Sequence, residues 1–271
     1  MENIGVMIVL FVLGAIMGSF ACCQAWRLKR NDKSKRSHCM NCDYQLKWYD
    51  NIPIVSWLVL RGKCRKCGKQ IGWMELWAEI LTGAAFVAIW AFWPWREALL
   101  AFDVVEIAKY LLFMANWVIL TILLVHDAKW RELPVRLMYV SWGLAGVFLA
   151  VIFGQNIVRG EQVVDLFGIL GALAILPALY YLMYKRSDEK WVGGGDWMLC
   201  MPLALMLGNF WLALAVLFLA NMMGCVVMLP VAIAKKNRKL RIPFGPFLIM
   251  AFLVVFLLQA KILHFVGFGV V

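Results

Sequence analysis

Long apolar stretches alternate with short polar ones along most of the chain. Eight apolar runs can be placed as helices that cross about 30 Å of hydrocarbon, the sixth being short. They cover residues 4–25, 77–93, 104–125, 134–153, 163–184, 197–207, 211–234 and 247–270. The pattern therefore predicts an all-α, polytopic membrane protein with about eight transmembrane helices.

Only one polar segment, from residue 27 to about residue 72, is long enough to form a domain of its own. We therefore expect a first transmembrane helix over residues 1–26, a small domain over residues 27–74 and a seven-helix membrane core over residues 75–271. The composition agrees, because 64% of the residues are hydrophobic and only 16% are charged, which is too apolar for a soluble globule.

The basic residues predict an orientation, because Lys and Arg near the ends of spans stay on the cytoplasmic side. With the N-terminus outside, 23 of the 27 Lys and Arg residues fall in cytoplasmic loops. These loops cover residues 27–69, 127–136, 185–190 and 235–241. The net charge of +11 is thus mostly a topology signal. It favours contact with anionic lipid headgroups and requires no nucleic-acid partner.

The polar segment holds two Cys-x2-Cys pairs separated by 21 residues. The pairs are Cys39 with Cys42 and Cys64 with Cys67. This spacing is typical of one tetrahedral zinc ion held by two knuckles, and four protein ligands leave no open position, so the zinc would be structural. A redox pair or unligated thiols are the alternatives, and His38 could replace one ligand. Basic neighbours of the pairs should lower the thiol pKa values.

The other four cysteines lie in apolar runs, where we expect them to be small packing residues. They are Cys22, Cys23, Cys200 and Cys225.

Carboxylates within or beside apolar runs are costly, so each is a functional candidate. They are Glu75, Glu79, Asp103, Glu106, Asp127, Asp165 and Asp196. We expect water or headgroups to solvate Asp103, Glu106 and Asp165, because they fall near the outer ends of spans. Glu75 sits at the cytoplasmic end of its span. Glu79 lies about one turn deeper, and a buried polar role and an interfacial one both stay open.

Asp127 and Asp196 differ from the others because the topology places both at the cytoplasmic boundary. The third span ends at Asp127 and the sixth begins at Asp196. If the two helices are neighbours, the carboxylates can share one proton, since two like charges in a low dielectric cannot both ionise cheaply. One acid and one base would then coexist, which is what peptide hydrolysis needs.

Gly193, Gly194 and Gly195 run directly into Asp196. Glycines allow unusual backbone dihedrals and let an extended substrate approach closely. The alternative is a flexible loop that ends in an N-capping aspartate. Spacing alone does not separate these interpretations.

The Gly193–Asp196 stretch matches the GxGD motif of intramembrane-type aspartyl proteases, and Asp127 with Leu133 and Pro134 resembles the D-x5-[IL]-P element of type IV prepilin peptidases. Further matches to that family lie in the first span, in the loop between the cysteine pairs, in the second span and near the C-terminus. They are Gly18-Ser19-Phe20 with Arg27, Trp48-Tyr49-Asp50, Pro53, Ser56-Trp57-Leu58, Arg61-Gly62, Glu79 with Thr82-Gly83, and Ile242-Pro243-Phe244-Gly245-Pro246-Phe247.

This resemblance implies an enzyme of the bacterial inner membrane that cleaves the leader of type IV prepilins or pseudopilins after a glycine, on the cytoplasmic face. It also implies methylation of the new N-terminus with S-adenosylmethionine. Asp127 and Asp196 would be the catalytic pair, and the four-cysteine module would belong to the part linked with methylation. The chain departs from the family at Cys22, at Met198 and around 73–77, where it reads WMELW.

Two other classes of protein stay open at this point. A proton- or cation-coupled transporter would use membrane carboxylates, but it predicts deeper acidic residues and often inverted repeats. A membrane assembly scaffold could dock through the zinc module, but it leaves the two aspartates unexplained.

Overall fold

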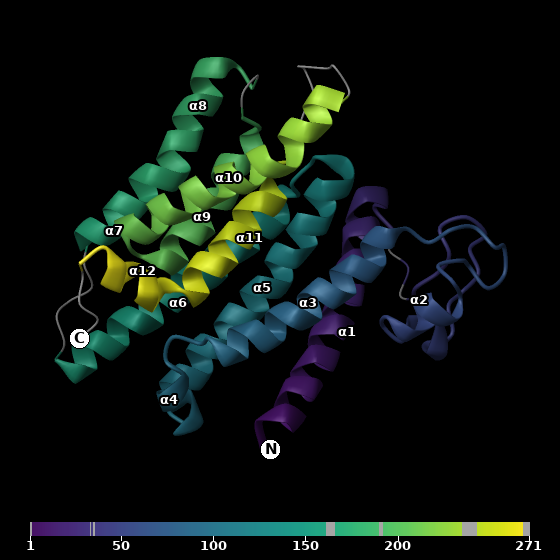
Figure 1. The fold of residues 1–271 in the computed structure, drawn as a ribbon, viewed down its shortest axis with the longest axis horizontal. Helices are drawn as coiled ribbons and strands as arrows, with labels where there is room; N and C mark the ends of the chain where they lie inside the picture. Colours follow the sequence, from purple (N-terminus) through teal and green to yellow (C-terminus); the bar gives the residue numbers. More distant parts are fainter. Residues whose placement is uncertain are drawn as a thin grey trace. The chain divides into compact units, whose positions relative to one another are not determined.

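The computed structural model describes residues 2–32, 34, 36–160, 166–189, 192–234 and 243–267. Within these ranges the regular structure is helical, with two isolated β-bridges and no strand (Figure 1). The predicted all-α fold is confirmed. The chain forms two compact units, Met1–Trp93 and Pro94–Val271.

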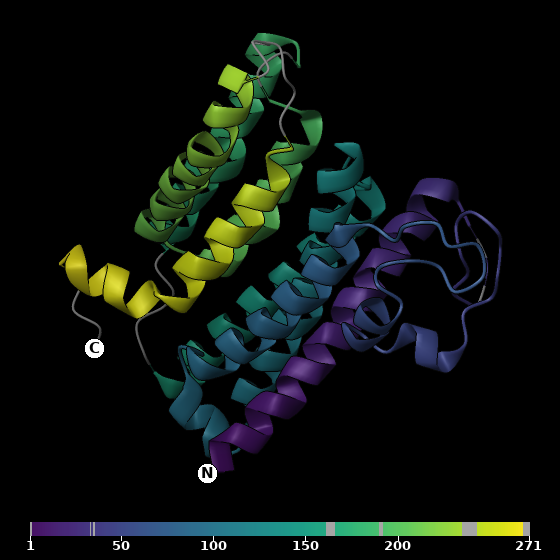
Figure 2. The same ribbon diagram turned by 45° about the vertical axis from the view of Figure 1, so that its right-hand side comes forward.

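The first unit is built on two long helices, α1 (Glu2–Arg30) and α3 (Trp73–Ala91), which lie side by side (Figures 1 and 2). Gly14 and Gly18 face α3 at a spacing of four residues. A Cβ atom on Gly14 would lie 2.8 Å from Cα of Gly83, and one on Gly18 would lie 2.8 Å from Cα of Glu79. The small residues therefore let the two backbones approach closely, as in membrane helix pairs.

The loop between α1 and α3 contains two short helices, η1 (Trp48–Asn51) and α2 (Val55–Val59), and two similar turns. Each turn closes with a β-bridge, His38 to Gln45 in the first and Lys63 to Gln70 in the second. The two cysteine pairs lie inside these bridges. The loop thus contains two similar knuckles, as the cysteine spacing predicted.

The second unit contains the remaining helices. They are α4 (Arg96–Leu100), α5 (Val104–Trp130), α6 (Val135–Arg159), α7 (Leu166–Leu173), the π-helical η2 (Ala174–Ala178), α8 (Leu179–Ser187), α9 (Gly194–Leu207), α10 (Phe210–Ala234), α11 (Gly245–Leu257) and α12 (Gln259–Phe265). A buried aromatic cluster joins α5, α6 and α11. Phe113 lies 4.3 Å from Phe256 between ring centroids, and Phe148 lies 6.4 Å from each of these rings.

Six helical segments of the described chain are long and apolar enough to span a membrane, α7, η2 and α8 together forming one of them. The predicted sixth span is α9, with only 14 residues. It contacts α6, α7, η2, α8 and α11, so other helices surround it (Figure 1). The expected eighth span is not one straight helix, because α11 and α12 are bent by 74° at Leu258. Polar residues of α12, such as Lys261, interrupt the apolar run there.

One carboxylate at the start of α5, Glu106, is not solvated as the sequence predicted. Glu106 is 1% exposed and lies 2.6 Å from Nζ of Lys109, whose side chain is also 1% exposed. Lys109 donates to Gln155 on α6, and Gln155 donates to Glu106. Glu106 is therefore buried in a polar network within the protein. Asp103 is partly exposed, caps α5 at Val105 and pairs with Arg159. Asp165 lies outside the described residues.

Candidate active site and metal centre

Asp127 lies in the last turn of α5 and is 5% exposed. The helix ends three residues later because Arg131 adopts a left-handed conformation, with φ of 56°, and donates its N–H to the Asp127 carbonyl at 2.7 Å. Pro134 then precedes α6, where a missing N–H costs nothing. The sharp reversal fixes the Asp127 side chain at the end of its helix.

The Asp127 carboxylate is held from the far end of the sequence. Its Oδ2 accepts the backbone N–H of Gly245, the first residue of α11, at 3.0 Å. A Cβ atom on Gly245 would lie 2.7 Å from that oxygen and 3.4 Å from Leu199 of α9. A glycine is therefore required here. The start of a helix also favours a negative charge. Sequence reasoning matched this stretch to the family but assigned Gly245 no contact.

Asp196 occupies the first turn of α9 and is half-buried. Its Oδ2 accepts the N–H of Gly193 at 3.1 Å, so the carboxylate caps the helix that carries it. Gly195, the residue before Asp196, lies against Leu133 in the loop after α5, and Gly245 lies beside both Asp127 and Leu199 of α9. The structure therefore brings together the two carboxylates that the sequence singled out.

Two of the three glycines before Asp196, Gly194 and Gly195, serve close packing. Gly193 has an extended backbone with φ of −71°, and Gly194 and Gly195 already belong to α9, so the expected unusual dihedrals are wrong. A Cβ atom on Gly195 would lie 2.9 Å from the side chain of Leu133, the residue before Pro134. The first turn of α9 and the loop after α5 thus touch each other.

A hydrogen bond between α6 and α9 also fixes the start of α9. The indole of Trp142 on α6 donates to the carbonyl of Met198 at 2.8 Å. Its ring lies 6.3 Å from that of Trp197. Asp196 is therefore positioned by the two residues that follow it as well as by the glycines.

The four cysteines of the first unit form one cluster, with all sulfur atoms within 4.8 Å of one another. Cys39 lies 3.8 Å from Cys67, and Cys42 lies 4.0 Å from Cys64. Tetrahedral zinc with Zn–S distances of about 2.3 Å separates its sulfurs by roughly 3.8 Å, so the donor set fits that ion. The same four residues are free thiols, which agrees with a metal site rather than disulfides.

The surroundings of the cluster favour the thiolate at Cys67, whereas the neighbouring cysteines raise the pKa of Cys42 to about 12. The backbone N–H of Lys69 lowers the pKa of Cys67 to about 6. Nδ2 of Asn41 donates to the Cys67 sulfur at 3.7 Å, and Lys69 holds that amide at 2.8 Å. The main cause is thus a backbone hydrogen bond, and not the charge of a basic side chain as expected.

The remaining candidates lie apart from the cluster. His38 faces Asp32 at 3.4 Å, and it does not join the metal-binding group found among the described residues. Cys22 and Cys200 are buried packing residues, as predicted, whereas Cys225 is exposed. Cys23 contacts Ser37.

Glu79 has the buried polar role that the sequence left open. It is 8% exposed, and its Oε2 accepts the N–H of Ile54 at 2.7 Å. Ile54 has φ of 62°, a left-handed value that is strained for a β-branched residue. Sequence reasoning missed this contact because the two residues lie on different elements.

Comparison with known proteins gives a consistent picture. The bacterial peptidase A24 N-terminal domain matches residues 12–93, which lie in the first unit. The prepilin leader peptidase/N-methyltransferase of Xanthomonas campestris pv. campestris is 30% identical over 78% of this chain and 68% of the relative. The corresponding proteins of Myxococcus xanthus and Vibrio cholerae are 34% and 27% identical over 80% and 93% of this chain.

The matched regions differ in length among these relatives. They cover 61% of the Myxococcus protein and 96% of the Vibrio protein. No solved structure matches the chain.

Proposed function

Because the chain belongs to the prepilin leader peptidase/N-methyltransferase family, we propose that it is a membrane aspartyl endopeptidase that removes the leader of type IV prepilins or pseudopilins after a glycine. Its second proposed activity is methylation of the new N-terminus. The names of the relatives support both activities. They give no support to a transporter or a scaffold.

One observation carries the proteolytic assignment: the end of α5, with Asp127, and the start of α9, with Asp196, lie together, because Leu133 meets Gly195 and Gly245 lies beside both Asp127 and Leu199. In this proposal the two carboxylates share one proton. The ionised one takes a proton from water, and the water oxygen attacks the scissile carbonyl carbon. The protonated one donates to the carbonyl oxygen. The C–N bond then breaks as the leaving nitrogen is protonated.

The backbone donors place the pair for this step. Gly245 donates its backbone N–H to one oxygen of Asp127, and Gly193 donates its backbone N–H to one oxygen of Asp196. Both carboxylates are therefore held by main-chain groups rather than by mobile side chains. Leu133 and Gly195 keep the loop after α5 in contact with the first turn of α9. Fixed geometry of this kind is a large part of an enzymatic rate enhancement.

In the first unit, Cys39, Cys42, Cys64 and Cys67 would hold a structural zinc ion, because their sulfur geometry fits it. S-adenosylmethionine would supply the methyl group: the neutral pilin amine forms the N–C bond, the C–S bond electrons go to sulfur, and one proton leaves the nitrogen. The metal has no open position in this scheme, so its role is to hold the loop in shape.

The chain is a multi-pass membrane protein, and we place it in the bacterial inner membrane with the N-terminus outside. The charge distribution supports cytoplasmic positions for the dyad and the cysteine module, since 23 of the 27 basic residues fall on that side. The partners would be prepilins or pseudopilins, which serve pili or protein secretion, together with anionic lipid.

Incubation of a purified prepilin with the purified protein, read out by mass spectrometry, tests the protease. Asp127→Asn and Asp196→Asn should each slow leader removal by about 10³-fold, within the range for loss of general acid–base catalysis. Asp188→Asn is a matched control, because Asp188 is an exposed residue just after α8. Leader removal at the wild-type rate by either dyad variant would refute the assignment.

A further inference from the structure

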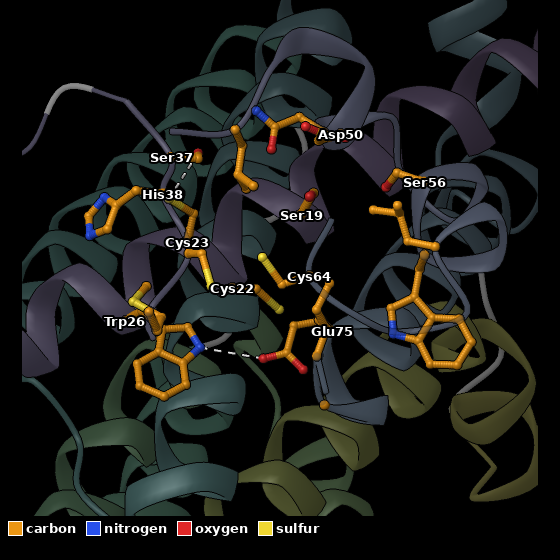
Figure 3. A pocket seen from close by; sticks show the side chains of 18 of the residues that line it. Ser19, Cys22, Cys23, Trp26, Ser37, His38, Asp50, Ser56, Cys64 and Glu75 are labelled. Carbon is orange, nitrogen blue, oxygen red and sulfur yellow. Dashed lines mark hydrogen bonds between the residues drawn. The ribbon is translucent and has the colours of Figure 1, made fainter. Parts of the chain in front are cut away.

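A cavity of about 680 Å³ lies within the first unit, bounded by α1, α3 and the loop that carries the cysteines (Figure 3). This volume falls within the roughly 300–1,000 Å³ of typical small-molecule sites. Neither residue of the proposed proteolytic dyad lines the cavity, since both belong to the other unit.

Two carboxylates one helical turn apart line this cavity. Glu75 accepts the indole N–H of Trp26 at 3.4 Å, as Figure 3 shows, and Glu79 accepts the N–H of Ile54 at 2.7 Å. Like charges at this spacing repel each other. A cation between or beside them would relieve that repulsion. The wall formed by α3 therefore favours a positively charged ligand.

Basic side chains also line the cavity, but two of them already have partners. Arg65 pairs with the buried carboxylate of Asp50 at 2.8 Å. Arg30 stacks on the Trp26 ring at 5.3 Å and donates to a backbone carbonyl. These contacts direct two of the positive charges to protein groups, and Lys69 donates to Asn41. Arg27 and Arg36 also line the cavity, so Glu75 and Glu79 form an acidic wall on α3 opposite a mixed lining.

An indole supplies a planar, apolar surface with a polar handle. Trp57 lines the cavity, and its buried Nε1 has no hydrogen-bond partner among the described residues. The ring is held in place, because Gly62 leaves room for it and Trp73 packs against it at 4.6 Å. An unpartnered buried donor on a fixed ring suits a heteroaromatic ligand that brings its own acceptor.

The cysteine module forms part of the same wall. Cys39 and Cys64 line the cavity as well as belonging to the metal cluster, and Figure 3 shows Cys64 among the lining side chains together with Cys22 and Glu75. The strained Ile54 joins the loop to Glu79. Strain of this kind concentrates at ligand sites. The metal would thus shape the cavity as well as stabilise the loop.

We propose that this cavity binds the methyl donor S-adenosylmethionine, with Glu75 and Glu79 facing its positive charge and Trp57 contacting its purine. The assignment rests on the proposed methyltransferase activity and adds the residues that hold the donor. S-adenosylmethionine combines the two features that the cavity selects, a sulfonium cation and a heteroaromatic base with hydrogen-bond acceptors.

Calorimetric titration of the full-length protein in nanodiscs tests this proposal, with S-adenosylmethionine and its uncharged thioether product S-adenosylhomocysteine as separate probes. The wild type should bind the sulfonium more tightly than the thioether. Glu79→Gln should weaken sulfonium binding by about tenfold or more and reduce the preference, since charge-assisted contacts are lost. Trp57→Phe should weaken both probes by about fivefold, the value of one hydrogen bond.

Each variant should retain the wild-type zinc content and leader cleavage, which excludes misfolding. Asp188→Asn should bind both probes like the wild type. If the wild type methylates cleaved pilin but neither cavity variant changes binding, the cavity assignment is wrong and the methyltransferase stands. If the wild type neither binds the donor nor methylates pilin, the proposed methylation fails. Displacement of the donor by anionic lipid in the nanodiscs would assign the cavity to a lipid headgroup instead.

Discussion

The two units achieve a defined structure by different means. Between α1 and α3, the described residues of 31–72 bury only Asp50, Gly62 and Cys64. The second unit has an aromatic core in which Phe113, for example, is 1% exposed. The loop of the first unit therefore has little apolar packing besides its cluster of four cysteines, which could hold a metal, whereas the second unit is held by apolar packing and places its carboxylates within that packing. In the proposed function, methylation belongs to the unit with the cysteine cluster, and proteolysis belongs to the unit with the apolar core.

Metal removal should produce the largest effect and should affect only the first unit. Cys64→Ser combined with Cys67→Ser, or treatment with a chelator, should unfold the loop, because structural zinc contributes about 10–16 kcal/mol in comparable peptides. Hydrogen exchange should rise throughout residues 36–72 while α5 and α9 stay protected.

Cys225→Ser is the matched control, because Cys225 is exposed and lies outside the cluster. Equal exchange in the apo and metal-loaded protein would show that the loop folds without the ion.

The buried ion pair between Lys109 and Glu106 allows the stability of the second unit to be tested separately. Lys109→Met should lower the free energy of unfolding by about 3–5 kcal/mol, because it leaves Glu106 charged and buried without its partner. The double variant with Glu106→Gln should recover most of that loss. Thermal unfolding measures both, with Lys261→Met on the exposed surface of α12 as control. A stable Lys109→Met protein would mean that the network contributes little.

Gly245→Ala should give a smaller and purely local effect. The added Cβ would lie 2.7 Å from Oδ2 of Asp127, so α11 or the carboxylate must shift. We expect leader cleavage to fall by about 10- to 100-fold, because small misplacements of catalytic groups are costly. Donor binding in the first unit should not change. Gly143→Ala is the control, since a Cβ there meets nothing within 4 Å. Equal cleavage by both variants would exclude a positioning role for Gly245.

Hydropathy and spacing predicted much of this structure. The apolar runs located the helices, and the Cys-x2-Cys spacing predicted the sulfur cluster. The shared depth of Asp127 and Asp196 made them a candidate pair only if their helices are neighbours. Each of these signals depends only on neighbouring residues in the sequence or on the position of a residue along its helix.

The remaining features depend on how helices are rotated and paired, which hydropathy does not encode. Glu106 was expected to be solvated because its position lies near a helix end, but the side chain contacts Lys109 on the same helix and Gln155 on α6. Gly245 meets Asp127 across 118 residues of sequence. The glycines before Asp196 were expected to provide unusual dihedrals, whereas Gly195 serves to accommodate Leu133.

The most direct test of the two-unit account supplies two substrates to two variants, an intact prepilin and a pilin already cleaved, with mass spectrometry as the readout. Asp127→Asn should leave the prepilin intact yet still methylate the cleaved pilin. Cys64→Ser with Cys67→Ser should remove the leader yet add no methyl group. Leader removal by Asp127→Asn, or methylation by the cysteine variant, would contradict the division of the two chemistries between the two units.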